Sequence, residues 1–151
     1  IKLAIVGRGK LETKLKRKVA RLNLQNNIYF FPPGDKSYLN EFYNSARIFV
    51  MTSQGEGLPM VMIEAMSCGL PVVIFADADI PDVAIHEFNS LLAPLGDIET
   101  MAQNIFNLLN DQQLYQRLEA NALKIREEKK GEYSLENLKA IWQEVFNKMN
   151  L

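Results

Sequence analysis

The sequence has 151 residues, 48% hydrophobic and 23% charged, a balance that fits one globular domain with a sizeable core. A formal net charge of −1 argues against a nucleic-acid binder held by bulk charge, because phosphate neutralisation needs a basic excess. The single cysteine excludes an internal disulfide and favours a reducing, cytoplasmic setting, and the single histidine rules out most His/Cys metal sites. No apolar run approaches the roughly 20 residues that span a bilayer, and no signal peptide is recognisable.

Strand-like runs alternate with helical patterns in the first third of the chain. Short β-rich runs predict strands at Lys2–Val6, Ile28–Phe31 and Arg47–Met51. Apolar residues at helical spacing predict a helix from about Lys10 to Leu22. Ser37 is the expected cap of a second helix, whose apolar face carries Leu39, Phe42, Tyr43 and Ala46.

The same alternation continues after the third strand. Pro59 suits the first turn of a helix and Gly69 its end. Beyond it we expect a strand "VVIFA", a short helix at Pro81–His86 and a short strand at Leu91–Ala93. The rest reads as helical: Asp97 caps a helix bearing Met101, Ile105 and Leu108, a second helix carries Leu114, Leu118, Ala122 and Ile125, and a last one begins at Ser134.

This order of elements predicts an α/β fold with a Rossmann-like, doubly wound parallel sheet and C-terminal helices. In such sheets ligands bind outside the carboxyl ends of the strands, near helix N-termini. Three predicted loops lie at that edge: Gly7–Lys10, Pro32–Ser37 and Ser53–Pro59. The chemistry is therefore to be sought in these loops.

The first of these loops contains two glycines, Gly7 and Gly9. They let the backbone approach a ligand closely, and the helix that follows offers free N–H groups to an anion. The third glycine of a dinucleotide-binding fingerprint is missing, and Leu11 occupies the next turn. A plain tight turn explains the two glycines equally well.

The third loop leads into the helical segment "MVMIEAMSC", which contains a carboxylate. The segment is apolar nearly all round, so we expect it to be buried, with Met60, Met62 and Met66 in the core. Burying a charge in such a helix costs free energy unless the charge is paired or has a functional role. Glu64 is therefore a candidate functional residue. A structural ion pair with a Lys or Arg is the other explanation of this residue.

Glu56 precedes Glu64 with seven residues between them. Eight residue steps correspond to roughly 12 Å of helix at ~1.5 Å per residue, or somewhat less where the first part is a loop. That span is comparable to an extended nucleotide-sugar, so the two carboxylates can accept hydrogen bonds from hydroxyls at its opposite ends. Gly55 and Gly57 keep the backbone accessible, and the helix that Pro59 begins is a favourable place for a diphosphate.

At this point the sequence resembles a known family. "EGLPMVMIEAMSCGLPVV" is similar to the E-x7-E signature of the group 1 (family 4) retaining glycosyltransferases, which have the two-domain GT-B fold. "LAIVGRGKLETKLKRKVARLNLQNNIYFFPPG", "FYNSARIFVMTSQGEG", "IPDVAIHEFNSLLAPLGD" and "YSLENLKAIWQEVF" resemble other segments of that family, so the likeness covers the whole chain. The resemblance implies an enzyme that transfers a sugar from a nucleotide-diphosphate sugar to a glycan or lipid-linked glycan, as in polysaccharide biosynthesis.

The resemblance also implies roles for individual residues of the motif. Glu56, the catalytic candidate, contacts hydroxyls of the donor sugar. Backbone amides around Gly57, Leu58 and Pro59 approach the sugar and the diphosphate. Glu64 accepts hydrogen bonds from the ribose hydroxyls, and the loop of Gly7–Gly9 borders the diphosphate and base.

In that family the transfer retains the configuration of the sugar and uses no metal or other cofactor. Helix dipoles and basic side chains stabilise the leaving diphosphate instead. We therefore expect residues 1–151 to be the donor-binding domain, incomplete at its N-terminal side. The basic pair that grips the diphosphate and the acceptor-binding domain lie upstream in the family, so the chain is expected to be inactive alone.

Several positions depart from the family pattern. Ala78 and Asp79 stand where two glycines are usual, Asp82 replaces a Glu, and Ser90 replaces the glycine of an "NG" pair. These departures support an alternative, a non-catalytic nucleotide-binding or regulatory domain that kept the fold.

Three other features have ordinary explanations. We expect His86 at the surface or at a cap, and Cys68 packed as a small apolar group. The basic segment Lys14–Arg21 predicts a solvated helix face, with peripheral contact to anionic lipid at the inner face of the membrane as its alternative in the full-length protein.

Overall fold

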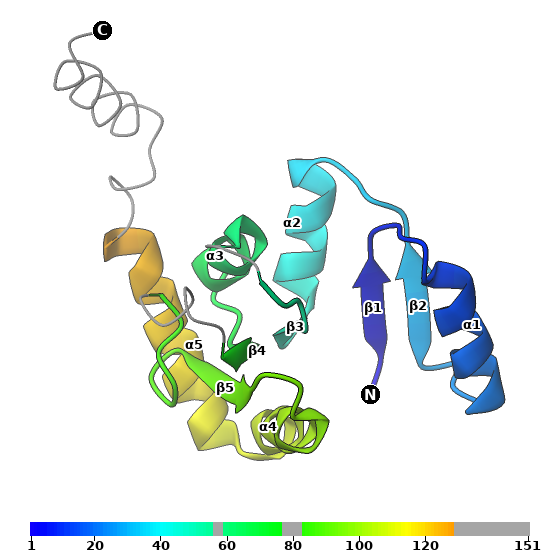
Figure 1. The fold of residues 1–151 in the computed structure, drawn as a ribbon. Helices are drawn as coiled ribbons and strands as arrows, with labels where there is room; N and C mark the ends of the chain where they lie inside the picture. Colours follow the sequence, from blue (N-terminus) through cyan, green and yellow to red (C-terminus); the bar gives the residue numbers. More distant parts are fainter. Residues whose placement is uncertain (56–58, 77–82, 129–151) are drawn as a thin grey trace, which may run out of the picture. The chain divides into compact units, whose positions relative to one another are not determined.

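The computed structural model describes residues 1–55, 59–76 and 83–128, and strands alternate with helices through most of this part of the chain. The elements follow one another as β1 (Leu3–Val6), α1 (Glu12–Arg21), β2 (Ile28–Phe31), α2 (Lys36–Ser45), β3 (Phe49–Met51), α3 (Met60–Ser67), β4 (Val72–Ala76), β5 (Ser90–Pro94), α4 (Ile98–Asn110) and α5 (Gln112–Glu128) (Figure 1). None of the described helices is long and apolar enough to cross a membrane. The chain divides into two units, residues 1–42 and 43–151.

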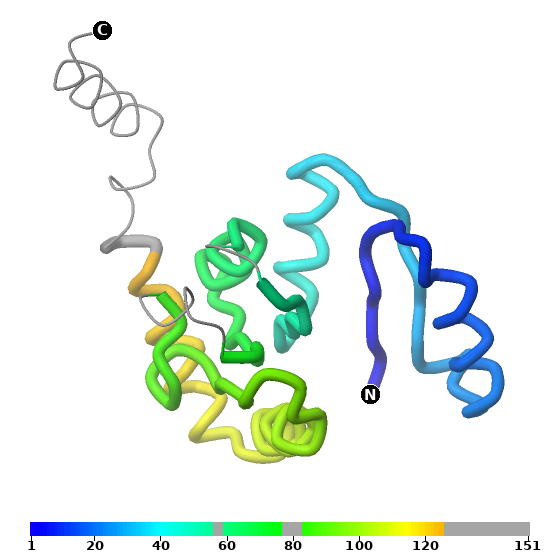
Figure 2. Tube along the Cα trace, in the orientation of Figure 1, coloured from blue at the N-terminus to red at the C-terminus, as the bar shows by residue number. Residues whose placement is uncertain are grey.

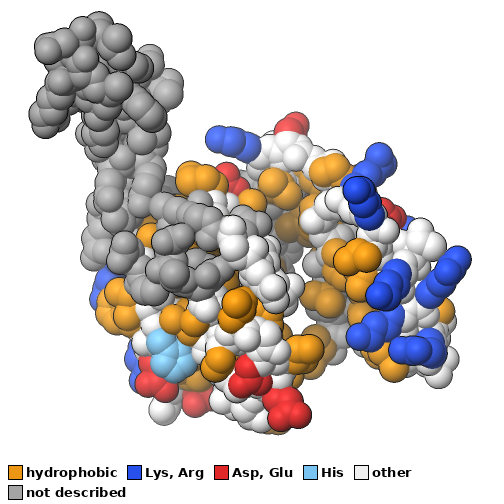
Figure 3. Space-filling view, viewed as in Figure 1, with side chains coloured by type: hydrophobic (Ala, Val, Ile, Leu, Met, Phe, Trp, Pro, Cys, Tyr) orange, Lys and Arg blue, Asp and Glu red, His pale blue; other side chains and the backbone are white. Residues whose placement is uncertain are grey.

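The first unit is a parallel strand pair with one helix between its strands in sequence. β1 and β2 pair from Leu3 opposite Ile28 to Val6 opposite Phe31. On α1, Val19 is half-buried and the ammonium of Lys16 lies 5.4 Å from the ring centre of Phe30. The other Lys and Arg side chains of α1 are exposed, which agrees with the expected solvated face (Figure 3).

The second unit contains a parallel three-stranded sheet in the order β3-β4-β5. Side chains of the central strand alternate between its two faces, as the period of a strand requires. Val72 and Ile74 pack into one buried cluster, whereas Val73 and Phe75 pack into the other. Because both faces are covered, β4 reads as the continuous apolar run typical of a buried parallel strand.

Helices cover both faces of this sheet. α3 packs on the face of Val72 and Ile74, and α4 packs on the opposite face (Figure 1). α5 serves both clusters: Leu118 belongs to the α4 side, and Ala122 and Ile125 belong to the α3 side. The tube in Figure 2 follows the alternation of strand and helix through this unit.

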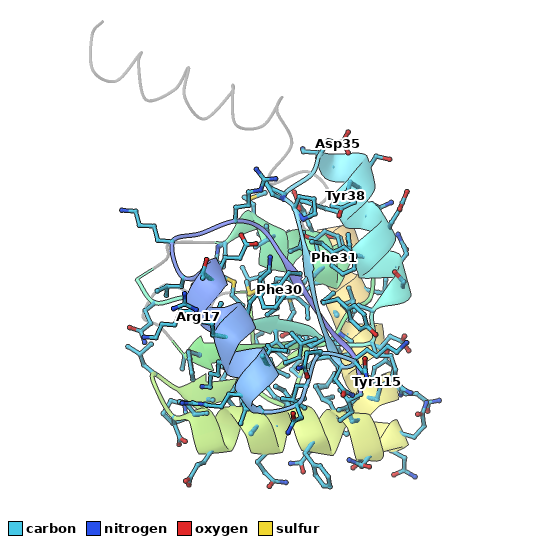
Figure 4. The ribbon with its side chains drawn as sticks, turned by 90° about the vertical axis from the view of Figure 1, so that its right-hand side faces the viewer. Arg17, Phe30, Phe31, Asp35, Tyr38 and Tyr115 are labelled. Carbon is cyan, nitrogen blue, oxygen red and sulfur yellow. The ribbon has the colours of Figure 1, made fainter. Side chains whose placement is uncertain are left out.

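Two predictions about helix starts and extents are corrected by side-chain hydrogen bonds. α2 is capped by Asp35 and not by Ser37, since Asp35 Oδ1 accepts from Tyr38 N at 2.9 Å (Figure 4). The predicted helix at Pro81–His86 is wrong over its described part, residues 83–86, which are not helical. Asn89 explains this: its side chain accepts from Ile85 N at 2.8 Å and donates to Val83 O at 2.9 Å, so it occupies backbone groups that a helix would use.

The burial predicted for α3 also needs correction. Met62 and Met66 are fully buried, as expected, but Met60 is exposed, as is Val61 beside it. Both exposed residues lie in the first turn of α3, where the helix starts beyond the end of β3. Cys68, expected to be buried, is half-buried at the helix C-cap. The predicted last helix, from Ser134, lies outside the described residues.

Candidate functional site

The N-terminus of α3 lies in the connection that follows β3, at the carboxyl edge of the sheet. β3 ends at Met51 and α3 begins at Met60, with Pro59 at the N-cap. Pro59 has φ −75° and ψ 111°, and its carbonyl accepts from Met62 N at 3.0 Å. The N-cap residue Pro59 makes no side-chain cap hydrogen bond, so the first turn of this helix offers an anion backbone N–H groups and the positive end of the helix dipole.

Glu64 lies on the fifth position of α3 and is half-buried. Four residue steps separate it from Met60, or roughly 6 Å along the axis at ~1.5 Å per residue. Its Oε2 accepts a hydrogen bond from the hydroxyl of Tyr43 at 3.2 Å. Glu64 thus lies about one helical turn along α3 from its N-terminus.

Among the side chains that the structure describes, Glu64 has no cation partner of the kind that the structural explanation requires. No described Lys or Arg nitrogen forms an ion pair with Glu64, and Oε1 accepts no hydrogen bond from a described residue. A carboxylate offers about four acceptor positions, and a single phenol hydroxyl uses one of them. Glu64 therefore keeps acceptor capacity next to the N-terminus of α3.

Tyr43 is the partner that sequence reasoning missed. The helical pattern placed it correctly on the buried face of α2, since its side chain is 9% exposed. Burial raises the pKa of Tyr43 to about 12, with a further contribution from the negative charge of Glu64. The signal available in the sequence was general: a buried tyrosine hydroxyl needs a hydrogen-bond partner.

The other predicted site residues fall into two groups. Gly7 and Gly9 lie in the first unit; Gly7 has a φ of +134°, and a Cβ added at either glycine would meet no atom within 4 Å. The backbone of this loop is therefore open at both glycines, which fits a ligand-binding loop and a plain tight turn alike. Glu56, Gly57 and Leu58 lie outside the described residues.

Ser90, one of the departures from the family pattern, and His86, expected at the surface or at a cap, both form hydrogen bonds with the backbone. Ser90 is fully buried at the start of β5, the end of the strand away from the carboxyl edge, and its hydroxyl donates to Ile85 O at 3.0 Å. His86 is exposed, and its Nδ1 accepts from Leu92 N at 3.0 Å. Ala78, Asp79 and Asp82 lie outside the described residues.

A search of the described part of the chain finds no group of three or more His, Cys, Asp or Glu that could hold a metal ion. What the second unit offers a ligand is instead an uncapped helix N-terminus with a carboxylate one turn away. This arrangement, at the carboxyl edge of a parallel sheet, is typical of nucleotide-binding α/β domains.

Comparison with known proteins agrees with that class and identifies the family. The model of the glycosyl transferases group 1 family matches residues 1–125, and the chain belongs to this family. An uncharacterised glycosyltransferase of Haemophilus influenzae is 32% identical over 143 residues. That match covers 93% of this chain and 38% of the relative, so the chain spans less than half the length of this protein.

Solved structures show the same fold. TarM of S. aureus, crystallised as a mutant in complex with fondaparinux, α-GlcNAc-glycerol and UDP, matches 97% of this chain with a TM-score of 0.85 and 29% identity, over 29% of its own length. Anabaena HepE in complex with UDP-glucose matches 82% of this chain with a TM-score of 0.75 and 25% identity, over 35% of its own length. The predicted fold class, the Rossmann-like second half of a GT-B glycosyltransferase, is confirmed.

Proposed function

We propose that this chain binds the nucleotide-diphosphate sugar donor of a glycosyltransferase that transfers the sugar with retention. The observation that carries the proposal is Glu64: a half-buried carboxylate with no described cation partner, one turn below an uncapped helix N-terminus. In this role the ribose hydroxyls donate to Glu64, and the diphosphate lies at the N-terminus of α3. Membership of the group 1 family supports the assignment.

The remaining contacts are part of the same proposal. Glu56 contacts hydroxyls of the donor sugar and acts as the catalytic residue, while the backbone at Gly57, Leu58 and Pro59 approaches the sugar and diphosphate. Backbone N–H groups and basic side chains stabilise the leaving diphosphate, so the reaction needs no metal cofactor. The acceptor is a glycan or a lipid-linked glycan that other parts of the enzyme bind.

The complexes of two similar structures support the donor class. TarM was crystallised with UDP, and HepE with UDP-glucose. Both proteins are much longer than this chain, and the complete reaction is proposed for a protein of that kind. The alternative of a domain that lost its chemistry gains no support from Ser90, because the buried hydroxyl of that residue holds the backbone of residue 85.

Ligand-detected NMR against UDP, GDP, ADP and UDP-glucose tests the proposal. We expect binding of at least one of them, weakened about tenfold by Glu64→Gln because a charged acceptor is lost. Glu119→Gln is the matched control, since Glu119 is also half-buried and accepts from a tyrosine hydroxyl, that of Tyr115 at 3.4 Å. If no nucleotide binds, or if Glu64→Gln binds as the unaltered chain does, the assignment of the site is wrong.

A further inference from the structure

We propose that Tyr43 is a positioning residue that holds the carboxylate of Glu64 in the orientation in which it receives the ribose hydroxyls. This inference rests on the proposed function, because it needs Glu64 to contact the ribose. It adds a residue from α2, outside the motif that contains Glu64. The hydrogen bond from the Tyr43 hydroxyl to Glu64 Oε2, at 3.2 Å, is the contact that carries it.

The Tyr43 side chain is itself fixed by its surroundings. It is 9% exposed, and its ring meets that of Phe49 edge to face, with ring centres 6.1 Å apart and an angle of 68° between the planes. Phe49 is the first residue of β3, so the ring is packed against the sheet. A donor held in this way has few other positions to adopt, and the oxygen that it binds is held with it.

The hydrogen bond from Tyr43 uses only one of the two carboxylate oxygens of Glu64. Glu64 Oε1 accepts no hydrogen bond from a described residue. Because a carboxylate offers about four acceptor positions, Glu64 can accept from ribose hydroxyls while Tyr43 holds Oε2.

The Tyr43 hydroxyl is protonated and can donate a hydrogen bond to Glu64. Its pKa is raised to about 12, chiefly by burial and then by the charge of Glu64, so the hydroxyl keeps its proton at any pH near neutral. A neutral phenol donates to the carboxylate without cancelling its charge, unlike a Lys or Arg. A carboxylate acceptor makes stronger hydrogen bonds to ribose hydroxyls than a neutral acceptor would.

The same hydrogen bond has a simpler explanation: it satisfies a buried hydroxyl and does nothing for a ligand. The two explanations differ in what they predict for a nucleotide without ribose hydroxyls. If Tyr43 positions Glu64, removing the Tyr43 hydroxyl weakens the binding only of nucleotides that carry both ribose hydroxyls. If Tyr43 is structural, its removal affects every nucleotide alike or none of them.

The experiment measures dissociation constants of UDP and 2′,3′-dideoxyuridine diphosphate for the chain and four variants. These are Tyr43→Phe, Glu64→Gln, the double variant, and Tyr115→Phe as the control, because Tyr115 also donates to a glutamate, Glu119. If GDP or ADP binds more tightly than UDP, that nucleotide and its dideoxy form are used. Circular dichroism checks folding, and Tyr43→Met, which fills the space flexibly, is used if Tyr43→Phe does not fold.

We expect Tyr43→Phe to raise the dissociation constant of UDP about five- to tenfold, as for loss of a hydrogen bond to a charged group. The dissociation constant of the dideoxy nucleotide should change by no more than about twofold. The double variant should bind UDP no more weakly than Glu64→Gln alone, because Tyr43 acts through Glu64. Tyr115→Phe should bind both nucleotides as the unaltered chain does.

Two results would overturn this inference and leave the proposed function intact. In the first, Glu64→Gln weakens the binding of UDP but Tyr43→Phe does not. In the second, Tyr43→Phe weakens the binding of both nucleotides equally. Failure of the proposed function has a different signature: no nucleotide binds the unaltered chain, or Glu64→Gln has no effect on UDP.

Discussion

Gly69 and Gly96, both in the second unit, have positive φ angles of +83° and +81°. Gly69 follows the C-cap of α3, where its N–H donates to Met66 O at 2.9 Å and Leu70 N donates to Ala65 O at 3.1 Å. These are the hydrogen bonds of a glycine-terminated helix. The sequence prediction that Gly69 ends the helix is thereby confirmed at the level of single hydrogen bonds.

Gly69→Ala should lower the free energy of unfolding by about 1–2 kcal/mol, because an L-residue is strained at this φ. A Cβ at Gly69 would also lie 3.3 Å from Leu123, whereas a Cβ at Gly96 would meet nothing within 4 Å. Gly96→Ala is therefore the control for the conformational cost alone. Urea unfolding measures both variants, and an unchanged midpoint for Gly69→Ala would contradict the account of this helix end.

Asp97 caps α4 through its carboxylate, which accepts from Thr100 N at 3.0 Å. The bonds to Thr100 hold the pKa of Asp97 below its ordinary value. Because the pKa is lower in the folded state, the ionised carboxylate stabilises the fold at pH values above the unfolded-state pKa, near 3.8. This stabilisation is lost as the pH falls through the folded-state pKa.

Asp97→Asn keeps an oxygen acceptor at the cap but cannot titrate. We expect the unaltered chain to be the more stable at neutral pH, and the difference in urea midpoint between the two proteins to shrink as the pH falls below about 4. Urea unfolding across this pH range measures the difference. A constant difference at all pH values would mean that the charge of Asp97 does not contribute through this cap.

At the scale of elements, much of the secondary structure was readable from apolar periodicity. β2 and β4 were predicted to the residue, and α5 was predicted with its buried face. The failures lie where side chains bind the backbone: Asp35 starts α2, and Asn89 prevents a helix at residues 83–86. Such bonds join residues through a geometry that a hydrophobic pattern does not encode.

α4 offers a direct test of the two-faced packing of the sheet. Leu108 is fully buried in the cluster on its side of the sheet, whereas Phe106 on the same helix is 59% exposed. Leu108→Ala should lower the free energy of unfolding by about 2–5 kcal/mol, and Phe106→Ala by no more than about 0.5 kcal/mol. Thermal or urea unfolding measures both; equal losses would contradict the assignment of the buried face.

At the scale of the whole molecule, the two units differ in how much apolar surface each buries. No described residue of 1–42 is buried, while the second unit contains both core clusters. The sequence predicted the class of both units, since each is a set of parallel strands with helices between them. It did not predict the division between them, because apolar periodicity reports on single elements and not on how well a group of elements packs.

This difference predicts unequal protection of backbone amides. In native-state hydrogen exchange, the amides of β4 should open only with global unfolding, whereas those of β1 and β2 should exchange through local opening of lower free energy. Equal protection of the two sheets across a denaturant series would show that both units unfold as one.

In the site, as in the fold, the sequence pattern pointed to single residues but not to the contacts between elements. Glu64 was singled out from the sequence because a charge in an apolar helix is visible there, and the alternative of an ion pair finds no partner among the described side chains. Tyr43 was not singled out, since its hydroxyl meets Glu64 through a tertiary contact that brings together residues 21 positions apart. The role of either residue in binding is a proposal that only a ligand can test.

Amide chemical shifts of the isotopically labelled chain, recorded as a nucleoside diphosphate is added, test the central claim most directly. The account predicts the largest shifts at the N-terminus of α3, at Met60 and Val61, together with Glu64 and Tyr43, and a titration midpoint about tenfold higher for Glu64→Gln. Shifts concentrated on α4 and α5, or none at any nucleotide concentration, would contradict the claim that this helix and its carboxylate bind the donor.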